Sequence, residues 1–351
     1  MKKVLVTGGA GFIGSNFIIY MLKNHDDIII TNLDSLTYSG NLNNLREIET
    51  DNRYSFVRGD VTDETLVRRL FEQKDFDWVV NFAAESHVDR AILNPNIFIL
   101  TNVSGTANLL SAAREHWENS GAYKNSVKFL QVSTDEVYGS LGPTGYFTES
   151  TPLDPHSPYS ASKASADLIV KSYFDTYSMP VNITRCSNNY GPYQFPEKLI
   201  PLMINNCLSH KELPVYGDGM QIRDWLFVDD HCKAIDAVLH DGVPGEVYNI
   251  GGHNERANID IVKTIVRYIS ETADPAVGEH LIKHVADRKG HDRRYGIDPE
   301  KIKNELGWQP ETGFDTGIKI TIDWYLANKL WMQQVIDGEY EQYYQKIYGE
   351  R

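Results

Sequence analysis

The feature that most constrains the fold is a short apolar strand that runs directly into three regularly spaced glycines. Residues 3–6 read KVLV, glycines follow at Gly8, Gly11 and Gly14, and apolar residues then recur at helical spacing over 17–22. A strand, a glycine turn and a helix form the first unit of a dinucleotide-binding α/β fold. The first glycine allows a tight turn, the second lets a pyrophosphate approach the backbone, and the third lets the helix pack closely. The free N–H groups at the start of the helix attract phosphate oxygens.

A carboxylate follows the second predicted strand, where folds of this kind bind the ribose. Residues 28–33 form that strand and Asp34 ends it, twenty residues after Gly14. A carboxylate there can accept hydrogen bonds from the adenine ribose hydroxyls and would repel a 2′-phosphate. The sequence therefore predicts NAD, and not NADP, as the cofactor.

Two further strands end in residues suited to a cofactor. The strand at 54–58 is followed by 59–61, which can hold the adenine edge, and the strand at 77–82 is followed by Ala83 and Ala84. Small residues let a cofactor pass close over the backbone, although close packing alone would explain them equally well. Ligands in open α/β sheets bind at the carboxyl ends of the strands, so we expect these segments to meet.

The central strand, at 127–132, runs into four polar residues, Ser133, Thr134, Asp135 and Glu136. Its apolar residues are typical of a parallel strand that is buried on both faces. One hydroxyl and two adjacent carboxyls at the ligand-binding edge can bond a substrate and move two protons. The same residue types also form helix caps and turns, so this pattern alone leaves both interpretations open.

A tyrosine and a lysine follow at the start of the next predicted helix. Tyr159 and Lys163 are four residues apart and therefore share one helix face. An ammonium beside a phenol favours the phenolate and is expected to lower the pKa of the tyrosine from about 10. Such a tyrosine can take a proton from an alcohol while a nicotinamide takes the hydride.

Composition narrows the classes of partner. The net charge of −14 argues against nucleic acid and anionic membranes, and no apolar run reaches the roughly 20 residues of a spanning helix. Cys186, Cys207 and Cys232 are odd in number and lack metal-site spacing, which favours a cytoplasmic protein without a metal. An anionic substrate would need the local cations of segments 195–201, 221–225 and 287–295.

Several sequence blocks together resemble the dTDP-glucose 4,6-dehydratase family of the extended short-chain dehydrogenases/reductases. They are spread from residue 4 to about 310 and read TGGAGFIGSNF, DSLTYSGN, NFAAESHVDR, VSTDEVYG, YSASKASAD, SNNYGPYQFPEKLIP and QIRDWLFVDD. The Thr134-Asp135-Glu136 triplet is what marks the dehydratases in this superfamily. Lys289 departs from the family, which usually has proline there.

The resemblance implies a lyase that converts dTDP-glucose to dTDP-4-keto-6-deoxyglucose and water. Tyr159, assisted by Lys163 and Thr134, would take the O4 proton while NAD takes the hydride from C4. Glu136 would remove the C5 proton, Asp135 would protonate the departing O6, and hydride would return to C6. Adjacent carboxyls can divide into acid and base because one ionised group raises the pKa of the other.

The strand-end patterns and the resemblance together give two sets of candidate residues. The predicted cofactor site consists of Gly8, Gly11, Phe12, Ile13, Gly14, Asp34, Ser35, Thr37, Asp60, Val61, Ala83, Ala84, Ser86, Thr101, Tyr159, Lys163 and Asn189. The predicted substrate site consists of Ser86, His87, Thr134, Asn188, Glu197, Lys198, Leu199, Arg223, Asn258, Asp287, Arg288, His291 and Tyr295. Arg223 can also be explained as an ion pair with Asp224 or as a helix cap. At least one of Arg293 and Arg294 is expected to make a surface salt bridge.

The predicted fold is a Rossmann-type, doubly wound parallel sheet with a smaller, interleaved C-terminal substrate-binding domain. Residues 1–187 and about 223–250 are assigned to the NAD-binding domain, and residues 188–222 and 251–351 to the nucleotide-sugar domain. A helical pattern runs from Asn94 to about Trp117. The family implies a homodimer through the helices near 95–117 and 159–178, although an apolar stripe there could equally be core. The tyrosine-rich tail carries no interpretable motif.

Three other functions share part of this pattern. A UDP-sugar 4-epimerase would share the fold, NAD and the Tyr/Lys pair, but it needs no base at C5. A CDP- or UDP-glucose 4,6-dehydratase differs only in the nucleotide, for which the residues offer no discrimination beyond the resemblance. A non-catalytic NAD-binding regulatory protein would not need Tyr159 and Lys163.

Overall fold

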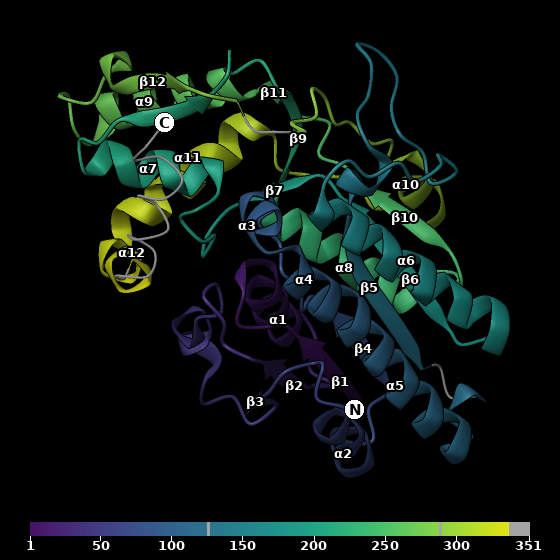
Figure 1. Ribbon diagram of the computed structural model, residues 1–351. Helices are drawn as coiled ribbons and strands as arrows, with labels where there is room; N and C mark the ends of the chain where they lie inside the picture. The colour runs from purple at the N-terminus through teal and green to yellow at the C-terminus, as the bar shows by residue number, and fades with distance from the viewer. Residues whose placement is uncertain (125–126, 288–289, 337–351) are drawn as a thin grey trace.

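A seven-stranded parallel sheet organises the larger lobe of the computed structural model, which describes residues 1–124, 127–287 and 290–336 (Figure 1). The strand order is β10-β6-β5-β4-β1-β2-β3, so the order reverses between β1 and β4. Every neighbouring pair in this sheet is parallel. Its strands are β1 (Lys2–Thr7), β2 (Ile28–Asp34), β3 (Tyr54–Arg58), β4 (Trp78–Asn81), β5 (Lys128–Thr134), β6 (Val181–Cys186) and β10 (Val247–Ile250).

Helices cover both faces of this sheet because its strands are apolar on both sides. Along β1, Val4 and Val6 enter one core while Leu5 enters the other, as the two-residue period of a strand requires. The helices of the large lobe are α1 (Phe12–Asn24), α8 (Val228–Asp241) and α10 (Glu300–Leu306) on the first face, and α2 (Glu64–Lys74), α5 (Thr106–Ser120) and α6 (Pro158–Tyr177) on the second. The predicted doubly wound fold is confirmed.

The predicted helix at 94–117 is one continuous helical run with a different turn in its middle. It comprises α4 (Pro95–Phe98), a π-helical stretch (Ile99–Gly105) and α5, and it is preceded by α3 (Val88–Leu93). The wider turn carries Asn102, which is buried. Single π turns of this kind often occur at functional sites.

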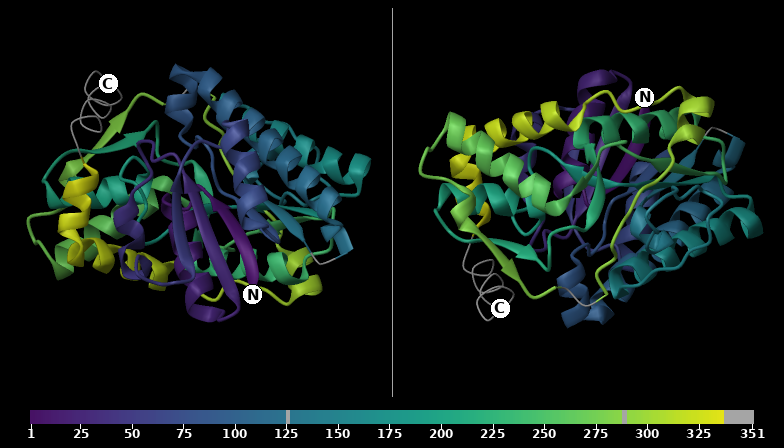
Figure 2. Two further views of the ribbon diagram at one scale, coloured as in Figure 1. Left: turned by 90° about the horizontal axis from the view of Figure 1, so that it is seen from below. Right: turned by 90° about the horizontal axis from the view of Figure 1, so that it is seen from above.

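A smaller lobe packs over one end of the sheet around its own apolar core (Figure 2). Its strands and helices are β7 (Asn188–Tyr190), α7 (Leu199–Leu208), β8 (Leu213–Tyr216), β9 (Ile222–Phe227), β11 (Glu255–Ala257), α9 (Asn258–Thr272), β12 (Ile282–Val285), α11 (Phe314–Ala327) and α12 (Lys329–Val335). They form two small sheets, β11-β9-β7 and β12-β8, with helices α7, α9, α11 and α12 beside them.

The predicted domain boundary at 223 needs a correction. Residues 223–227 belong to β9, which pairs with β7 and β11 and not with the large sheet. Trp225 and Phe227 enter the core of the small lobe while Leu226 enters that of the large lobe, so β9 lies at the junction. The chain therefore returns to the large lobe only at α8.

Two predictions from composition can be compared with this fold. The three cysteines are buried and none forms a disulfide. Within the described ranges, no helix combines the length and apolar character needed to cross a membrane.

Candidate active site

A cavity of about 320 Å³ opens where the carboxyl ends of β1, β2, β4, β5 and β6 meet. It lies beside the reversal of strand order between β1 and β4, which is where doubly wound sheets leave a ligand crevice. Every residue of the predicted cofactor site lines it. Strand-end patterns far apart in the sequence are thus brought to one place by the parallel topology.

Of the three regularly spaced glycines around the start of α1, only Gly11 leaves space for a ligand against its backbone. A Cβ on Gly8, whose φ is +68°, would lie 2.7 Å from the Ala83 nitrogen, and a Cβ on Gly14 would lie 2.4 Å from the Gly8 oxygen. These two glycines are required by the packing of the protein itself. A Cβ on Gly11 would meet only the Gly8 oxygen, at 3.3 Å. Since Gly11 lines the cavity and begins α1, its bare backbone fits a pyrophosphate at the helix start.

Asp34 is held rigidly at the adenine end of the cavity. Its Oδ2 accepts the Ala10 N–H at 2.9 Å and its Oδ1 accepts the Leu36 N–H at 2.8 Å. Burial raises the pKa of Asp34, while these two hydrogen bonds lower it. Each carboxylate oxygen retains a second lone pair, so the residue fits the ribose hydroxyls of NAD.

The polar triplet after the central strand is divided between a strand end and a tight turn. Thr134 is the last residue of β5, and Asp135 and Glu136 open a 3₁₀ turn, Asp135–Tyr138. Thr134 Oγ1 donates to Asp135 Oδ1 and accepts the Glu136 N–H, both at 3.3 Å. The cap expected from the residue types is therefore present, and it orients the two carboxyls. Glu136 lines the cavity, whereas Asp135 lies behind it and is only 2% exposed.

Asp135 is in an environment that keeps its carboxyl protonated. Burial is the largest cause that raises its pKa well above the ordinary range, and the charges of Glu136 and Asp224 add to it. Its Oδ2 is buried without a hydrogen-bond partner. A protonated carboxyl beside Glu136 is the state that a proton donor requires.

Tyr159 and Lys163 both line the cavity from the first turns of α6. Lys163 Nζ donates to the Val132 carbonyl at 2.7 Å, and burial lowers its pKa. The net shift of the Tyr159 pKa is opposite in direction to the lowering expected from Lys163. Burial, followed by the charge of Glu136, raises that pKa well above its usual value, and a hydrogen bond with Thr134 is the cause that lowers it.

Two substrate candidates between β7 and α7, Glu197 and Lys198, also line the cavity. Glu197 is buried and accepts from Arg90 Nε and from the Tyr38 hydroxyl, each at 3.0 Å. Lys198 Nζ donates to the Ser86 carbonyl at 2.8 Å. Sequence reasoning missed Tyr38 and Arg90 as partners of Glu197. Both lie in blocks that carry the resemblance, but no local spacing connects them with a carboxylate more than a hundred residues away.

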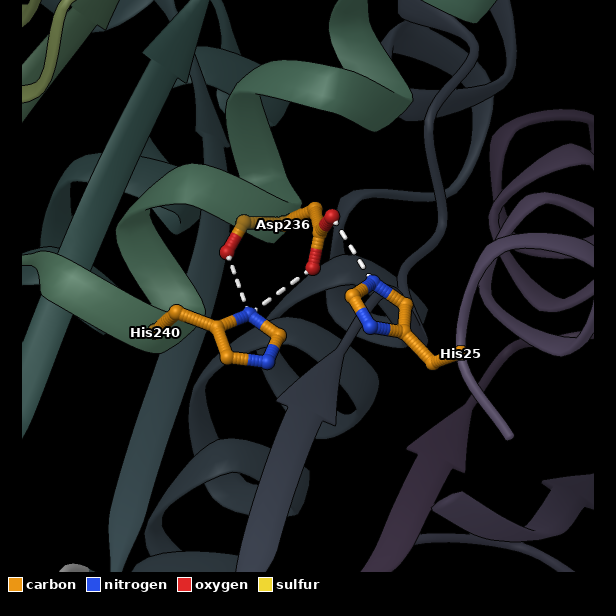
Figure 3. Close-up of side chains that lie close together, drawn as sticks. All are labelled: His25, Asp236 and His240. Atoms are coloured by element: carbon orange, nitrogen blue, oxygen red, sulfur yellow. Dashed lines mark hydrogen bonds and ion pairs between the residues drawn. The ribbon is translucent and has the colours of Figure 1, made fainter. Parts of the chain in front are cut away.

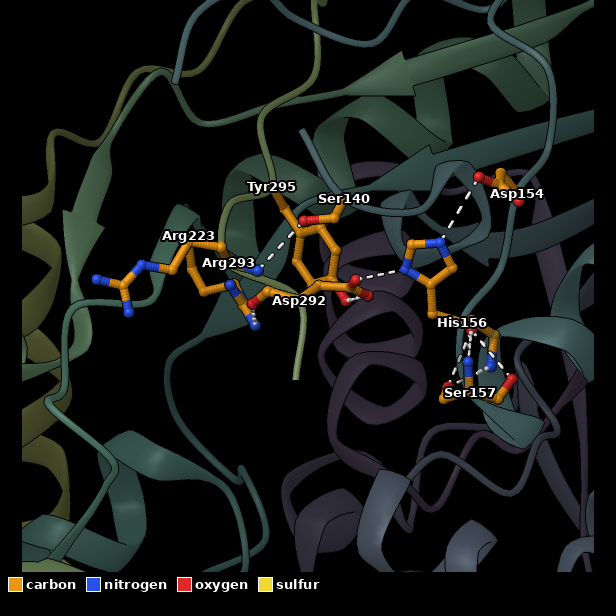
Figure 4. A network of polar contacts seen from close by, with 9 residues as sticks. Ser140, Asp154, His156, Ser157, Arg223, Asp292, Arg293 and Tyr295 are labelled. Carbon is orange, nitrogen blue, oxygen red and sulfur yellow. Dashed lines mark hydrogen bonds and ion pairs between the residues drawn. The ribbon is translucent and has the colours of Figure 1, made fainter. Parts of the chain in front are cut away.

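A second group of substrate candidates, Arg223 and Tyr295, belongs to a polar network with Asp292 and His156 (Figure 4). The Arg223 guanidinium lies 4.1 Å from the centre of the Tyr295 ring and donates to the Asp292 carbonyl at 3.0 Å. The charge of Arg223 lowers the pKa of Asp135, and the charge of Glu136 raises the pKa of Tyr295. Asp224 accepts the backbone N–H groups of Gly252 and Asn254, and not Arg223, so the ion-pair alternative for Arg223 is wrong.

His156 joins this network to the helix that carries Tyr159. Its Nδ1 lies 2.6 Å from Asp292 Oδ1, and Asp292 Oδ2 accepts the Tyr295 hydroxyl at 2.5 Å. Ser157, the next residue, caps α6 by accepting the Ser160 N–H. Sequence reasoning missed both His156 and Asp292 because their side chains meet only through the tertiary fold, 136 residues apart.

The remaining substrate candidates among the described residues do not line the cavity. His291 and Asp287 pair at 2.7 Å, and Asn258 keeps a buried amide oxygen without a hydrogen-bond partner. His87 is buried, with Nε2 3.4 Å from the Glu197 carbonyl, so a solvated loop does not explain it. Leu199 is the first residue of α7. Arg288 and the unusual Lys289 lie outside the described residues.

Arg293 and Arg294 both form ion pairs, as was expected of at least one of them. Arg293 lies 2.9 Å from Asp218, and Arg294 lies close to Glu255 at 2.6 Å. Asn188, in contrast, lines the cavity and has a buried amide oxygen without a hydrogen-bond partner. It is therefore available to a ligand.

Comparisons with known proteins agree with this geometry. The family model described as GDP-mannose 4,6 dehydratase matches residues 5–321. A dTDP-glucose 4,6-dehydratase of Xanthomonas campestris pv. campestris (strain B100) is 54% identical over 97% of each chain. One of Escherichia coli is 52% identical over 96% of this chain and 97% of its own.

Solved structures show the same likeness in three dimensions. The dTDP-glucose 4,6-dehydratase of Bacillus anthracis in complex with NAD has a TM-score of 0.85 and 50% identity, and the match covers 96% of this chain and 100% of that one. The UDP-glucose 4-epimerase of Thermus thermophilus, also complexed with NAD, has a TM-score of 0.82, with coverage of 93% and 99%, but only 27% identity.

Proposed function

The chain belongs to the dTDP-glucose 4,6-dehydratase family, and we propose from this premise that it converts dTDP-glucose to dTDP-4-keto-6-deoxyglucose and water with NAD as its cofactor. The observation that carries the proposal is the buried Asp135 beside the cavity-lining Glu136. Two carboxyls in such different surroundings can act as acid and base in one elimination. A 4-epimerase needs no base at C5, so the pair favours the dehydratase.

The cofactor is held by the backbone around Gly11 and by Asp34, both of which line the cavity. When bound, NAD accepts hydride from the sugar C4, returns it to C6, and in its oxidised form adds the positive charge that a buried phenolate needs. The Ala83 and Ala84 backbone lies along the same wall and leaves room for a flat ring. These residues orient the cofactor and exclude water from it.

Tyr159 receives the proton from the sugar O4 through its phenolic oxygen. Thr134 bonds this tyrosine and stabilises its ionised form, as the direction of that contribution to its pKa indicates. Lys163, anchored on the Val132 carbonyl, holds its ammonium on the same helix face. The proton is moved within a buried site, where such transfers are most sensitive to neighbouring charge.

Elimination follows from the acidity of C5–H beside the new ketone. Glu136 removes that proton from within the cavity. Asp135, held protonated by burial and by the charge of Glu136, gives its proton to O6 as water leaves. When C6 is reduced, C5 regains a proton, which Glu136 supplies after exchange with solvent. Because the two groups are coupled, their protons belong to the pair as a whole.

The small lobe is assigned to the nucleotide sugar. Lys198 lines the cavity, and Arg223 lies beside the catalytic carboxyls, so both supply cations to a diphosphate in an otherwise acidic chain. Asn188, with its unsatisfied amide oxygen, supplies an acceptor for a sugar hydroxyl or the base. We assign these roles to the small lobe because β7 and the segment before α7 bring Asn188 and Lys198 to the cavity, and β9 brings the charge of Arg223 near Asp135.

The test is a substrate panel. Purified protein is incubated with dTDP-, UDP- and CDP-glucose in deuterated water, and the product is analysed by mass spectrometry and NMR. The expected product from dTDP-glucose has lost water and carries solvent deuterium at C5. Scrambling at C4 without loss of water would support the epimerase, and preference for UDP- or CDP-glucose would replace the proposed nucleotide.

A homodimer in the cytoplasm completes the proposal. Exposed apolar side chains lie on α3, the π-helical stretch and α6, and α4 and the π-helical stretch pack beside α6 (Figure 1). The most exposed are Ile99, Leu100 and Leu168, at 52%, 58% and 62%, with Leu93 at 50%. Such a patch is typical of an interface. Sedimentation velocity should give twice the chain mass, and Leu100→Glu should give a monomer; an unchanged dimer in that variant would move the interface elsewhere.

The unpaired cysteines support the cytoplasmic location. All three are buried as free thiols, the state that a reducing compartment maintains. Fractionation of the source cell followed by immunodetection is the direct test.

A further inference from the structure

Two histidines and an aspartate meet at the end of the molecule opposite the active site (Figure 3). His25 follows the last turn of α1, and Asp236 and His240 lie one turn apart on α8. Trp78, the first residue of β4, packs edge-to-face on the His240 ring at 4.9 Å. The cluster thus lies near the amino ends of the strands, whereas the cavity opens at their carboxyl ends.

The ligand atoms of the three side chains converge. His25 Nε2 lies 3.0 Å from Asp236 Oδ2, and His240 Nδ1 lies 2.9 Å from Asp236 Oδ1. All three residues offer ligand atoms within 4.8 Å of one another. With metal–ligand bonds of about 2.1 Å, neighbouring ligands of one zinc ion lie roughly 3–3.5 Å apart. Small side-chain rotations therefore suffice to bring these atoms onto one ion.

Asp236 Oδ1 is held only by an imperfect contact. It makes no hydrogen bond of good geometry and pairs with His240 Nδ1 at 2.9 Å, a nitrogen that also bonds the Asp236 backbone carbonyl at 3.0 Å. Once the imidazole nitrogens that face the carboxylate lose their protons, a metal ion between Oδ1 and the two rings would replace this shared contact with direct bonds.

We propose that His25, Asp236 and His240 form a binding site for a divalent transition-metal ion of the Zn²⁺ type. Two imidazoles and a carboxylate favour Zn²⁺, Co²⁺ or Ni²⁺ over the oxygen-preferring Mg²⁺ and Ca²⁺. The side chains of His25 and His240 are 23% and 36% exposed, so a water molecule can complete four-coordination.

The surrounding charges are consistent with a cation. Asp26 and Asp27 follow His25 directly, and Asp241 follows His240. Two neighbouring cations are compensated by carboxylates, since Lys233 pairs with Glu311, and Arg53, which donates to the His25 carbonyl at 2.7 Å, pairs with Asp51. Tyr20 donates to Asp236 Oδ2 at 3.4 Å and orients the carboxylate.

Metal binding would join α1 to α8, two helices that pack side by side on one face of the sheet. An ion that binds only the folded chain raises its melting temperature by mass action. The cluster lies near the amino ends of the strands and the cavity lies at their carboxyl ends. Metal binding should therefore leave the affinity for NAD unchanged.

The experiment uses full-length protein that has been freed of any affinity tag and treated with chelator. Titration with ZnCl₂ should show one site per chain and a rise in melting temperature, and CoCl₂ should give the visible absorption of a tetrahedral Co²⁺ ion. His25→Gln and His240→Gln should each weaken Zn²⁺ binding at least roughly tenfold, which is about 1.4 kcal/mol.

The matched control is His116→Gln. His116 also pairs with an aspartate, Asp75, at 2.8 Å, and no third ligand joins them among the described residues. This variant should bind Zn²⁺ as the parent does. The proposal is overturned if the parent shows no cobalt spectrum and no zinc-dependent stabilisation, or if both cluster variants keep the parental affinity. If a cluster variant fails to fold, the cobalt spectrum of the parent decides the matter.

Discussion

The nucleotide end of the cavity and the network around Arg223 are built in different ways. At the nucleotide end, backbone groups and glycines at neighbouring strand ends form the surface, and Asp34 is fixed by two backbone N–H groups. Around Arg223, side chains from distant segments hold one another, as His156 and Asp292 do at 2.6 Å. The first half is therefore set by steric packing, whereas the second depends on charge and responds to pH.

The largest effect is expected at Glu136, which lines the cavity and whose charge raises the pKa of Tyr295 in the Arg223 network. Glu136→Gln should lower turnover by roughly 10²–10⁴ while NAD still binds, because only the C5 proton transfer is lost. Stopped-flow turnover and C5 deuterium exchange measure this. Glu72→Gln, at an exposed position on α2, is the control; near-parental turnover of Glu136→Gln would remove its role as base.

Two glycine substitutions separate packing from ligand contact at the nucleotide end. Gly14→Ala places its Cβ 2.4 Å from the Gly8 oxygen and should destabilise the fold by about 1–3 kcal/mol. Gly11→Ala meets only one atom, at 3.3 Å, so it should keep its stability and lose affinity for NAD. Urea unfolding and NAD titration report the two quantities. Equal NAD affinity in Gly11→Ala and the parent would contradict the pyrophosphate assignment.

A smaller effect, on the KM, is expected from the network of side chains around Arg223. The hydrogen bond and charge of Asp292, with Asp154 nearby, raise the pKa of His156 above its ordinary 6.5. The ion pair is therefore fully present below pH 6.5 and is lost as pH rises through the raised value. The KM for dTDP-glucose should rise with pH by about two- to fivefold, in keeping with an exposed pair.

His156→Gln tests that cause. The variant cannot titrate at position 156, so its KM should be high and flat across the same pH range. A matched control is His210→Gln, because His210 also pairs with an aspartate, Asp274, but lies outside the network around Arg223. If the KM of the parent and of His156→Gln changes with pH in the same way, the pair with Asp292 does not position the segment that carries Asp292 and Tyr295.

The smallest effect is expected for Arg293→Ala. Arg293 and Asp218 are both more than half exposed, so water and salt screen their ion pair. Melting temperature and KM should match the parent within error. A clear rise in KM would show that Arg293 contacts the nucleotide sugar.

The same contrast explains which residues of the site could be predicted from the sequence. Gly11, Asp34 and Glu136 each follow a strand at a recognisable spacing, and parallel strands bring their carboxyl ends together in any doubly wound sheet. Tyr38 and Arg90, which hold Glu197, follow no such rule. Residues 223–227 were assigned to the wrong lobe because β9 alternates between two cores, and an apolar strand does not reveal which sheet it joins.

The amino-acid sequence by itself determined the strand–glycine–helix unit, the preference for NAD, the Thr134-Asp135-Glu136 triplet and the Tyr159/Lys163 pair, because each depends on spacing along a single element. Only the tertiary structure decided that burial is the largest cause raising the pKa of Asp135, that burial opposes ionisation of Tyr159, and that His25 meets Asp236 and His240. Burial and contact between distant segments depend on how helices and strands pack, and no local pattern encodes that packing.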